Sequence, residues 1–220
     1  MNSTELQKDR AAALRLVPVS RETAARLDEF VALLLRWQKA VQLVAPSTLP
    51  RLWTRHIADS LQIIEHAPAA KRWIDLGSGG GFPGLVVAIA LADAPETIVH
   101  LVESDTRKAA FLREAARIIG APAEVHAERI ESVAERFAGD VEIVTARALA
   151  PLARLLELAA PLLRGGARGI FLKGQDVDNE LTQAAKSWNI TAKTFPSRSD
   201  SRGRILIVDR VVRQNVAGQH

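Results

Sequence analysis

Apolar residues recur along this chain in two different patterns. Up to about residue 67 they return every three or four positions, which is typical of one face of a helix. A long helix capped by Ser20 is predicted from these apolar positions: Leu27, Phe30, Val31, Leu34, Leu35, Val41 and Val44. Pro46 and Pro50 bracket a predicted turn. A further helix has the apolar positions Leu52, Ile57, Leu61 and Ile64. Residues 1–67 are therefore predicted to form a helical extension.

From residue 68 to residue 220 short apolar runs alternate with amphipathic segments. The predicted strands are 72–76, 98–103, 122–126, 141–146, 167–172, 190–195 and 204–211. The predicted helices are 83–92, 106–119, 130–136, 151–163 and 176–186. This alternation predicts an α/β domain with a doubly wound parallel sheet. Only a loop separates the last two strands, so they should pair antiparallel. The linker near 67–71 is short, so we expect the extension to pack on the sheet domain.

Composition narrows the function classes. The chain has 48% hydrophobic and 25% charged residues, as in ordinary globular proteins, and a net charge of +4 that is compatible with a nucleic-acid partner. It has no cysteine, so we predict no disulfide, no zinc or other metal site and no thiol nucleophile. The polar start and the lack of a long apolar run predict a cytoplasmic protein without a membrane partner. No dimer stripe is visible, so we expect a monomer.

The segment from Trp73 to Val87 reads WIDLGSGGGFPGLVV and carries the clearest functional signal. A buried strand, a glycine turn and a helix N-terminus together cradle nucleotide-like ligands, because glycine lets the backbone turn tightly and approach the ligand. The spacing Gly79-x-Gly81-x-x-Gly84 matches a dinucleotide site, whereas Gly77-x-Gly79-x-Gly81 matches a methyltransferase. The pattern of glycines alone therefore leaves two cofactors open.

Neighbouring residues favour S-adenosylmethionine. Asp75 precedes the turn, where a carboxylate can hold the ammonium of the cofactor but would repel an NAD pyrophosphate. Pro83 suits the first turn of the next helix. Glu103 ends the second strand, where its carboxylate would accept hydrogen bonds from both ribose hydroxyls. The seven-strand order with an antiparallel last pair is the methyltransferase variant of the fold.

The ends of the fourth and fifth strands should form the acceptor site, and they offer Arg147 and Lys173. The Asn/Asp-Pro-Pro-aromatic set of exocyclic-amine methyltransferases, the Lys-Asp-Lys-Glu set of ribose 2′-O enzymes and a cysteine nucleophile are all absent. An acceptor that needs no deprotonation fits these ends, and guanine N7 is one. Small-molecule acceptors stay open, as does a helix-start role for Arg147 paired with Glu142 or Glu157.

These motifs together resemble the 16S rRNA guanine-N7 methyltransferase family, small-subunit methyltransferase G, also called glucose-inhibited division protein B. The resemblance covers nearly the whole chain. Its residues are Arg55-His56-Ile-Ala-Asp59-Ser60, Asp75-Leu-Gly77 through Phe82-Pro83-Gly84, Glu103-Ser104, Arg107-Lys108, Phe111-Leu112, Arg129-Ile130-Glu131, Ala146-Arg147-Ala148, Leu172-Lys173-Gly174 and Arg204. The chain departs from the family where W-N-K-x-x-N-L-T is replaced, because Gln38, Gln42 and Val44 stand for two asparagines and a threonine.

The resemblance implies a class I S-adenosylmethionine-dependent methyltransferase of Rossmann-like fold. Its substrate would be N7 of one guanine in the 530 loop of 16S rRNA, within the 30S subunit or an assembly intermediate. Together with the residues above, the predicted cofactor site is Asp75, Gly77, Gly79, Gly81, Phe82, Glu103, Ile130, Glu131 and Arg147. Arg147 and Lys173 are the catalytic candidates.

The RNA-binding candidates are Arg55, His56, Lys173, Arg202 and Arg204. His56 is open to a second interpretation, as a polar contact between the extension and the sheet domain. A small-molecule methyltransferase, a non-catalytic ribosome assembly factor and, more distantly, a dinucleotide oxidoreductase are the alternative functions.

Overall fold

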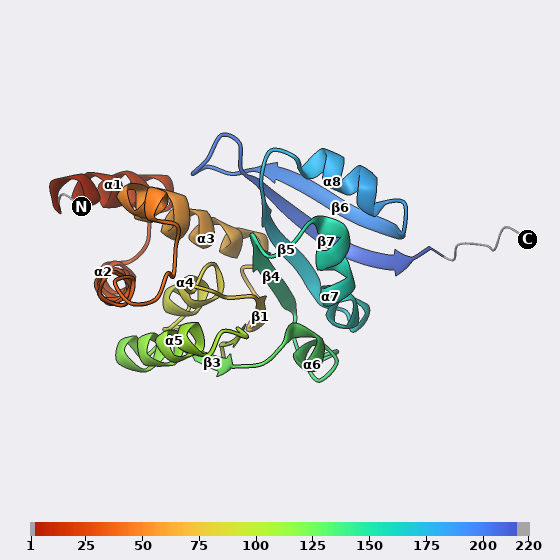
Figure 1. Ribbon diagram of the computed structural model, residues 1–220, viewed down its shortest axis with the longest axis horizontal. Coiled ribbons are helices and arrows are strands. Elements are labelled where there is room, and N and C mark those ends of the chain that lie inside the picture. The colour runs from red at the N-terminus through yellow and green to blue at the C-terminus, as the bar shows by residue number, and fades with distance from the viewer. Residues whose placement is uncertain (1–2, 215–220) are drawn as a thin grey trace, which may run out of the picture.

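The computed structural model describes residues 3–214, and strands and helices alternate from residue 72 to residue 196, after which the last strand follows without a helix (Figure 1). The α-helices are α1 (Ser3–Leu16), α2 (Arg21–Trp37), α3 (Asp59–Leu61), α4 (Gly84–Ala90), α5 (Thr106–Ile119), α6 (Ile130–Ala134), α7 (Leu152–Arg164) and α8 (Val177–Ala184). The helices of other pitch are η1 (Pro46–Arg51), η2 (Trp53–Ala58) and η3 (Gln62–His66). The strands are β1 (Arg72–Leu76), β2 (Ile98–Val102), β3 (Ala123–His126), β4 (Ile143–Arg147), β5 (Arg168–Lys173), β6 (Trp188–Pro196) and β7 (Arg204–Arg213). No helix within the described range is long and apolar enough to span a membrane.

The strands form one sheet in the order β3-β2-β1-β4-β5-β7-β6. The first five strands along the chain pair in parallel, whereas β7 pairs antiparallel with both β5 and β6. The strand order reverses between β1 and β4, and this switch point is where a doubly wound sheet opens a crevice for ligands. The predicted fold class and the antiparallel final pair are confirmed.

Two apolar layers cover the sheet. One face packs against α4, α5 and the N-terminal helices, through a core that includes Phe30, Trp53 and Phe111. The other face packs against α6, α7 and α8, through a core that includes Leu156 and Phe171. The helical extension therefore shares a core with the sheet, and burial of this apolar surface holds it there. The division of the chain at residue 67 stays a prediction.

One carboxylate also connects two parts of the helical extension, α1 and the start of η2. Asp9 of α1 accepts hydrogen bonds from the backbone N–H of Trp53 at 2.7 Å and from the hydroxyl of Thr54 at 2.6 Å. Both groups lie at the start of η2, whose first N–H groups have no partner within the helix. Asp9 therefore caps the helical segment that carries Arg55 and His56.

The long helix predicted from Ser20 is shorter than its apolar pattern indicates. Ser20 does cap α2, but the helix ends at Trp37, and Val41 and Val44 lie buried in a loop. The side chain of Gln38 holds that loop, because its amide oxygen accepts from the N–H of Leu43 and Val44 and its nitrogen donates to the Val44 carbonyl. A side-chain amide thus replaces helical hydrogen bonds, which apolar spacing cannot reveal.

The prediction of a turn between Pro46 and Pro50 is wrong, because both prolines lie in the 3₁₀ helix η1. Pro46 occupies the first helical position, where the missing N–H has no helical partner to lose. The helix predicted beyond residue 50 is a run of turns with changing pitch, in which η2 is a π-helix. Such π segments occur often at functional sites.

Candidate active site

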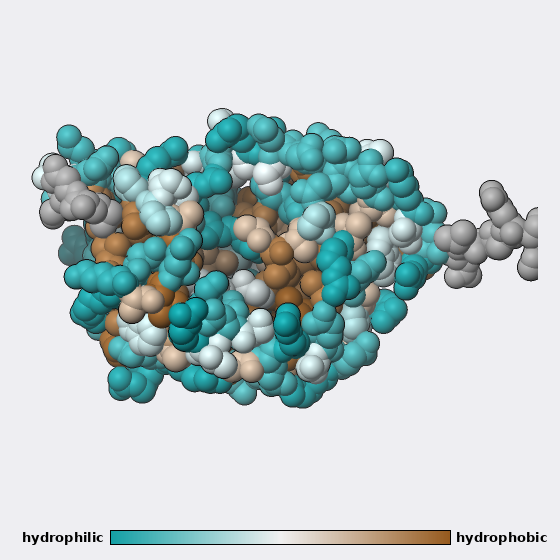
Figure 2. Space-filling model, in the orientation of Figure 1, coloured by the Kyte–Doolittle hydropathy of each residue, from teal (hydrophilic) through white to brown (hydrophobic). Residues whose placement is uncertain are grey.

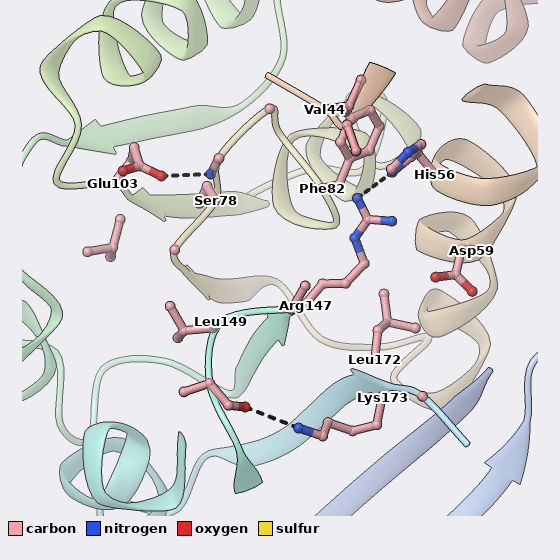
Figure 3. A pocket seen from close by; sticks show the side chains of 18 of the residues that line it. Val44, His56, Asp59, Ser78, Phe82, Glu103, Arg147, Leu149, Leu172 and Lys173 are labelled. Atoms are coloured by element: carbon pink, nitrogen blue, oxygen red, sulfur yellow. Dashed lines mark hydrogen bonds between the residues drawn. The ribbon is translucent and has the colours of Figure 1, made fainter. Parts of the chain in front are cut away.

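A cavity of about 1070 Å³ opens at the carboxyl ends of the parallel strands. Figure 2 shows the molecule hollowed near its centre, with hydrophobic side chains inside and hydrophilic ones around the hollow. The lining comes from the loop before η1, η2, the glycine turn, the ends of β2, β4 and β5, the start of α6 and the β6–β7 loop. Sequence segments far apart thus meet at one site (Figure 3).

The glycine turn forms one wall of the cavity. Gly77 and Gly79 have φ angles of +70° and +55°, which favour glycine. A Cβ on Gly77 would stand 2.7 Å from Leu149 Cδ1, and a Cβ on Gly80 would stand 2.8 Å from the Leu43 carbonyl oxygen. The turn is therefore in close contact with the extension on one side and with the loop after β4 on the other.

Glu103 lies at the far end of this turn, as predicted from its place after β2. Its carboxylate accepts a hydrogen bond from the N–H of Gly79 at 2.9 Å (Figure 3). It also accepts from the N–H of Asp105 at 2.7 Å. Each oxygen keeps a free lone pair, and the side chain lines the cavity. The geometry allows Glu103 to accept from a ligand's hydroxyls.

Asp75 does not line the cavity, although the sequence indicated a cofactor contact. Its side chain is 1% exposed and accepts from the Thr145 hydroxyl at 2.8 Å and the Gly84 N–H at 3.1 Å. Burial raises the pKa of Asp75 to about 6, and the hydrogen bonds from Thr145, Ser78 and Gly84 oppose that shift. Asp75 therefore supports the start of α4 below the turn.

Gly81 is likewise buried outside the cavity lining, against Leu85 and Phe30. Ile130 and Glu131 do line it, at the start of α6, and Glu131 pairs with Arg154 at 2.9 Å. Arg154 is a residue that the sequence did not single out. The two residues that the sequence analysis placed beside the adenine thus line the cavity, and the acidic one of them already has an ion-pair partner.

Arg147 extends from the end of β4 into the cavity, where three groups hold it. Its guanidinium donates to His56 Nδ1 at 2.5 Å and to the Arg55 carbonyl oxygen at 3.3 Å, and it lies 5.1 Å from the centre of the Phe82 ring (Figure 3). Neither Glu142 nor Glu157 is its partner. Arg147 is thus positioned by the extension and by Phe82 after the glycine turn, rather than by the helix that follows β4.

The hydrogen bonds around His56 fix its protonation state. Arginine can only donate, so Nδ1 of His56 must accept. Its Nε2 then donates to Thr48 Oγ1 at 2.8 Å, and the Thr48 hydroxyl donates to the Ala45 carbonyl at 2.7 Å. Burial and the charges of Arg147 and Arg55 lower the pKa of His56 to about 2, so the ring is neutral. Both ring nitrogens are occupied, which favours the second interpretation of His56, a contact between extension and sheet.

Arg147 stays charged at neutral pH. Burial lowers its pKa to about 10, while the carboxylates of Asp59 and Asp75 oppose that shift. A neutral His56 beside it avoids a second cation at contact distance. The pair therefore presents one positive charge to the cavity.

Lys173 ends β5, as predicted, but its ammonium is occupied. It donates to the Ala150 carbonyl at 3.1 Å (Figure 3). It also forms an ion pair with Glu180 at 2.6 Å. Its side chain is 9% exposed. Lys173 thus ties β5 to α8 and to the loop after β4, beside the cavity.

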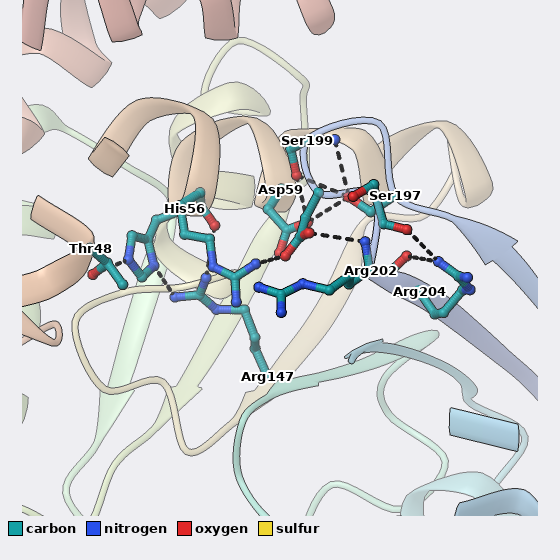
Figure 4. A network of polar contacts seen from close by, with 12 residues as sticks. Thr48, His56, Asp59, Arg147, Ser197, Ser199, Arg202 and Arg204 are labelled. Atoms are coloured by element: carbon teal, nitrogen blue, oxygen red, sulfur yellow. Dashed lines mark hydrogen bonds and ion pairs between the residues drawn. The ribbon is translucent and has the colours of Figure 1, made fainter. Parts of the chain in front are cut away.

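The β6–β7 loop is bound to the extension by a polar network (Figure 4). Asp59 accepts from the hydroxyls of Ser197 at 2.9 Å and Ser199 at 2.8 Å, and Asp200 forms an ion pair with Arg55. These partners lie about 140 residues apart along the chain. The network closes one side of the cavity.

Of the two arginines predicted on this loop, only Arg202 lines the cavity. Its guanidinium is exposed and has no hydrogen-bond partner among residues 3–214. Arg204 donates instead to the carbonyls of Ser201 and Gly203 in its own loop. Arg202 is therefore the cation on this loop that is free to bind a phosphate.

Several lining residues were not predicted to be site residues, among them Leu43, Thr48, Ala148 and Leu149. Ala148 has a φ of +50°, an uncommon backbone conformation for a residue with a Cβ, directly after Arg147. The A-R-A motif was visible in the sequence, but neither spacing nor composition signals a strained alanine.

Comparison with known proteins assigns the family. The model of the rRNA small subunit methyltransferase G (GidB) family matches residues 23–203. The chain belongs to the rRNA small subunit methyltransferase G family. Its relatives include ribosomal RNA small subunit methyltransferase G of Bradyrhizobium sp. strain BTAi1, 57% identical over 97% of this chain and 96% of that protein. The protein of that name from Rhodopseudomonas palustris strain BisB18 is 56% identical over 96% of this chain and 90% of its own length. The family predicted from the motifs is confirmed.

Solved structures support the fold. An O-methyltransferase from Bacillus cereus, in complex with SAH, matches with a TM-score of 0.61 at 16% identity, covering 96% of this chain and 100% of that one. A SAM-dependent O-methyltransferase from Thermotoga maritima matches with a TM-score of 0.54 at 15% identity, over 84% and 73% of the two chains. At these identities the likeness concerns the fold alone.

Proposed function

We propose that this member of the small-subunit methyltransferase G family transfers a methyl group from S-adenosylmethionine to N7 of one guanine in the 530 loop of 16S rRNA. The observation that carries the proposed acceptor is the state of the carboxylates in the cavity. Each carboxylate of the described lining already has an ion-pair or hydrogen-bond partner. They are Asp59, Glu103, Glu128, Glu131, Glu180 and Asp200. Glu103 keeps free lone pairs but is assigned to the ribose, so no carboxylate is left as a general base for the acceptor, which suits a lone pair that needs no deprotonation.

The cavity residues fit the cofactor. A volume of about 1070 Å³ is at the upper end for small-molecule pockets and leaves room for a cofactor and a base together. Gly77, Gly79 and Phe82 would contact the cofactor, Glu103 its ribose, and Ile130 and Glu131 its adenine. S-adenosylmethionine supplies a methyl group on a sulfonium, which a nucleophilic lone pair can take directly.

The acceptor side then acts by positioning and by excluding water. Arg147, held by His56 and Phe82, can donate to the O6 or phosphate oxygen of the guanine nucleotide. Lys173 keeps the ends of β4 and β5 together through Ala150 and Glu180, so its contribution is to the shape of the pocket.

RNA would approach over the rim of the cavity. Arg202 is free for a phosphate contact, and Arg55 lies beside it in an ion pair with Asp200. His56 and Arg204, which the sequence placed on RNA, have internal partners and are proposed to position Arg147 and the β6–β7 loop instead.

The test uses tritiated S-adenosylmethionine and 30S subunits from a strain that lacks this enzyme, with label mapped by cleavage specific for 7-methylguanine. We expect one labelled guanine, in the 530 loop. Label at another atom or in another RNA would contradict the proposal. Absence of label with intact cofactor binding would point to a small-molecule acceptor or an assembly role.

An Arg202→Ala variant sharpens this test. Loss of one phosphate contact should weaken binding to 30S subunits and reduce its salt dependence by about one ion. Arg210→Ala is the matched control, because Arg210 is an exposed arginine on β7 that does not line the cavity. Equal effects of the two variants would show that Arg202 has no specific role.

A further inference from the structure

Three metal-binding side chains meet at the edge of the sheet, outside the cavity. His100 lies on β2, and Glu124 and His126 lie on β3, which is an edge strand (Figure 1). The parallel register places His100 beside Glu124, and His126 follows two positions later, so the three side chains share one face. Their ligand atoms all lie within 4.8 Å of one another.

The distances are close to those between ligands of one ion. His100 Nδ1 lies 3.1 Å from His126 Nε2 and 3.7 Å from Glu124 Oε2. Two ligand atoms that each stand 2.0–2.1 Å from a tetrahedral zinc ion are roughly 3.3 Å apart. Small rotations of the two rings and of the carboxylate are sufficient to direct all three groups at one point.

The histidine side chains are buried, whereas the carboxylate beside them is exposed to solvent. His100 and His126 are 8% and 9% exposed, and the Phe137 ring covers them with centroid distances of 4.4 Å and 5.2 Å. The Glu124 side chain is 60% exposed. An ion can therefore reach the histidines from the solvent side, past the carboxylate.

Neighbouring cations have other partners. Arg136 pairs with Glu128 at 2.9 Å, and Arg113 donates to the Val125 carbonyl at 3.2 Å. No other group of three or more histidines or carboxylates within residues 3–214 could hold a metal ion. The hydrogen bond between the two rings is the alternative to a metal, since one neutral ring can donate to the other.

We propose that His100, Glu124 and His126 bind one divalent transition-metal ion of the zinc class, with water as the remaining ligand. Imidazole and carboxylate ligands suit zinc, cobalt and nickel, whereas magnesium and calcium prefer oxygen ligands alone. The lack of cysteine predicts no metal site, and this prediction is too broad, because the absence of cysteine excludes only thiolate ligands.

The bound ion would have a structural role, because it would connect β2 and β3. β3 is paired along one side only, through β2, and the ion would add a second connection between these strands. Residues 128–131, which line the cofactor side of the cavity, begin two positions after His126. Binding therefore should stabilise the fold and the lining segment without taking part in methyl transfer.

The experiment uses the full, tag-free chain after treatment with a chelator. Calorimetric titration with Zn²⁺ should show saturation at one ion per chain. Thermal denaturation of the Zn²⁺-saturated protein should give a Tm about 5 °C higher than that of the metal-free protein. Co²⁺ should give the visible absorption of a four-coordinate site. Mg²⁺ should neither bind with this stoichiometry nor raise the Tm.

Three variants connect binding to these side chains. His126→Ala should abolish stoichiometric binding, and Glu124→Gln, at an exposed position that folding tolerates, should weaken it about tenfold or more. His66→Ala removes a histidine outside the group and should leave binding unchanged. Stoichiometric binding that survives both His126→Ala and Glu124→Gln, or no binding by the wild-type chain, would overturn the proposal and leave a hydrogen-bonded histidine pair.

Discussion

The two sides of the cavity are built differently. The proposed cofactor side comes mainly from the glycine turn between β1 and α4, together with Glu103 after the neighbouring strand and the start of α6. The acceptor side joins η2, the ends of β4 and β5 and the β6–β7 loop, through contacts such as Arg147 to His56, which are 91 residues apart. Backbone geometry shapes the first side, whereas side-chain partners assemble the second.

This difference predicts how each side fails. A change in the cofactor side should disturb local packing and cofactor affinity. A change in the acceptor side should leave cofactor binding in place and impair transfer to RNA, because its partners meet only through the tertiary fold.

The largest effect is expected for Gly84→Ala. A Cβ at Gly84 would stand 2.5 Å from Asp75 Cβ and 2.6 Å from Leu101 Cδ2, inside a packed layer with no space to yield. The free energy of unfolding should fall by about 3 kcal/mol, with loss of S-adenosylmethionine binding. Urea denaturation measures this. Gly174→Ala is the control, since a Cβ there meets nothing within 4 Å, and equal stability of the two variants would contradict the prediction.

Arg147→Ala tests the acceptor side. The kcat/KM for rRNA should fall about 100-fold, as when an aligned charged donor is removed, while the Kd for S-adenosylmethionine rises less than about tenfold. Single-turnover methylation and calorimetry separate the two quantities. A larger loss of cofactor affinity than of transfer would place Arg147 on the cofactor side.

His56 makes the stability of the fold depend on pH. Its pKa is lowered to about 2 in the folded chain, whereas the unfolded chain binds the proton near pH 6.5. Its stabilising contribution is therefore present above pH 6.5 and is lost as the pH falls toward 2, by about 2 kcal/mol between pH 7 and pH 5.

Denaturation of wild type and His56→Asn at both pH values measures this contribution. The asparagine keeps an acceptor for Arg147 but does not titrate, so the difference between the two proteins should shrink toward pH 5. An unchanged difference would show that His56 titrates alike in the folded and unfolded states.

Asp200→Ala should have a smaller effect, confined to the acceptor side. It removes the partner of Arg55 and the acceptor for the Arg202 N–H at 3.0 Å, so the β6–β7 loop loses its fixed place. Methylation of 30S subunits should fall about tenfold, with cofactor affinity unchanged. Asp200→Asn keeps the acceptor without the charge, so its methylation activity should lie between that of the wild type and that of Asp200→Ala. Wild-type activity in the alanine variant would exclude a role for the loop.

The smallest effect is expected for Gln38→Ala. Its amide makes three hydrogen bonds to the loop that carries Leu43 and Val44 beside the glycine turn. Stability should fall by about 1–2 kcal/mol, since the loop's polar groups can turn to water. Gln42→Ala, at an exposed position, is the control for thermal denaturation. Equal Tm values would show that the loop does not depend on Gln38.

Sequence alone determined the alternation of strands and helices, the antiparallel last pair, the glycine turn and the places of Glu103, Arg147 and Lys173 at strand ends. Periodic burial, glycine conformation and the handedness of crossovers are local or general rules, so these features can be read along the chain. The family followed from the same motifs and was confirmed.

The tertiary structure decided which of these residues face the cavity and which partners they have. Asp75 stands in the motif but is buried under α4, and the partner of Arg147 is a histidine on the extension. The loop after Trp37 has buried apolar residues at helical spacing, yet it is not a helix, and the side-chain amide of Gln38 holds it in place. Such contacts depend on how distant segments pack and on which polar groups lose water together, and no spacing along the chain encodes that.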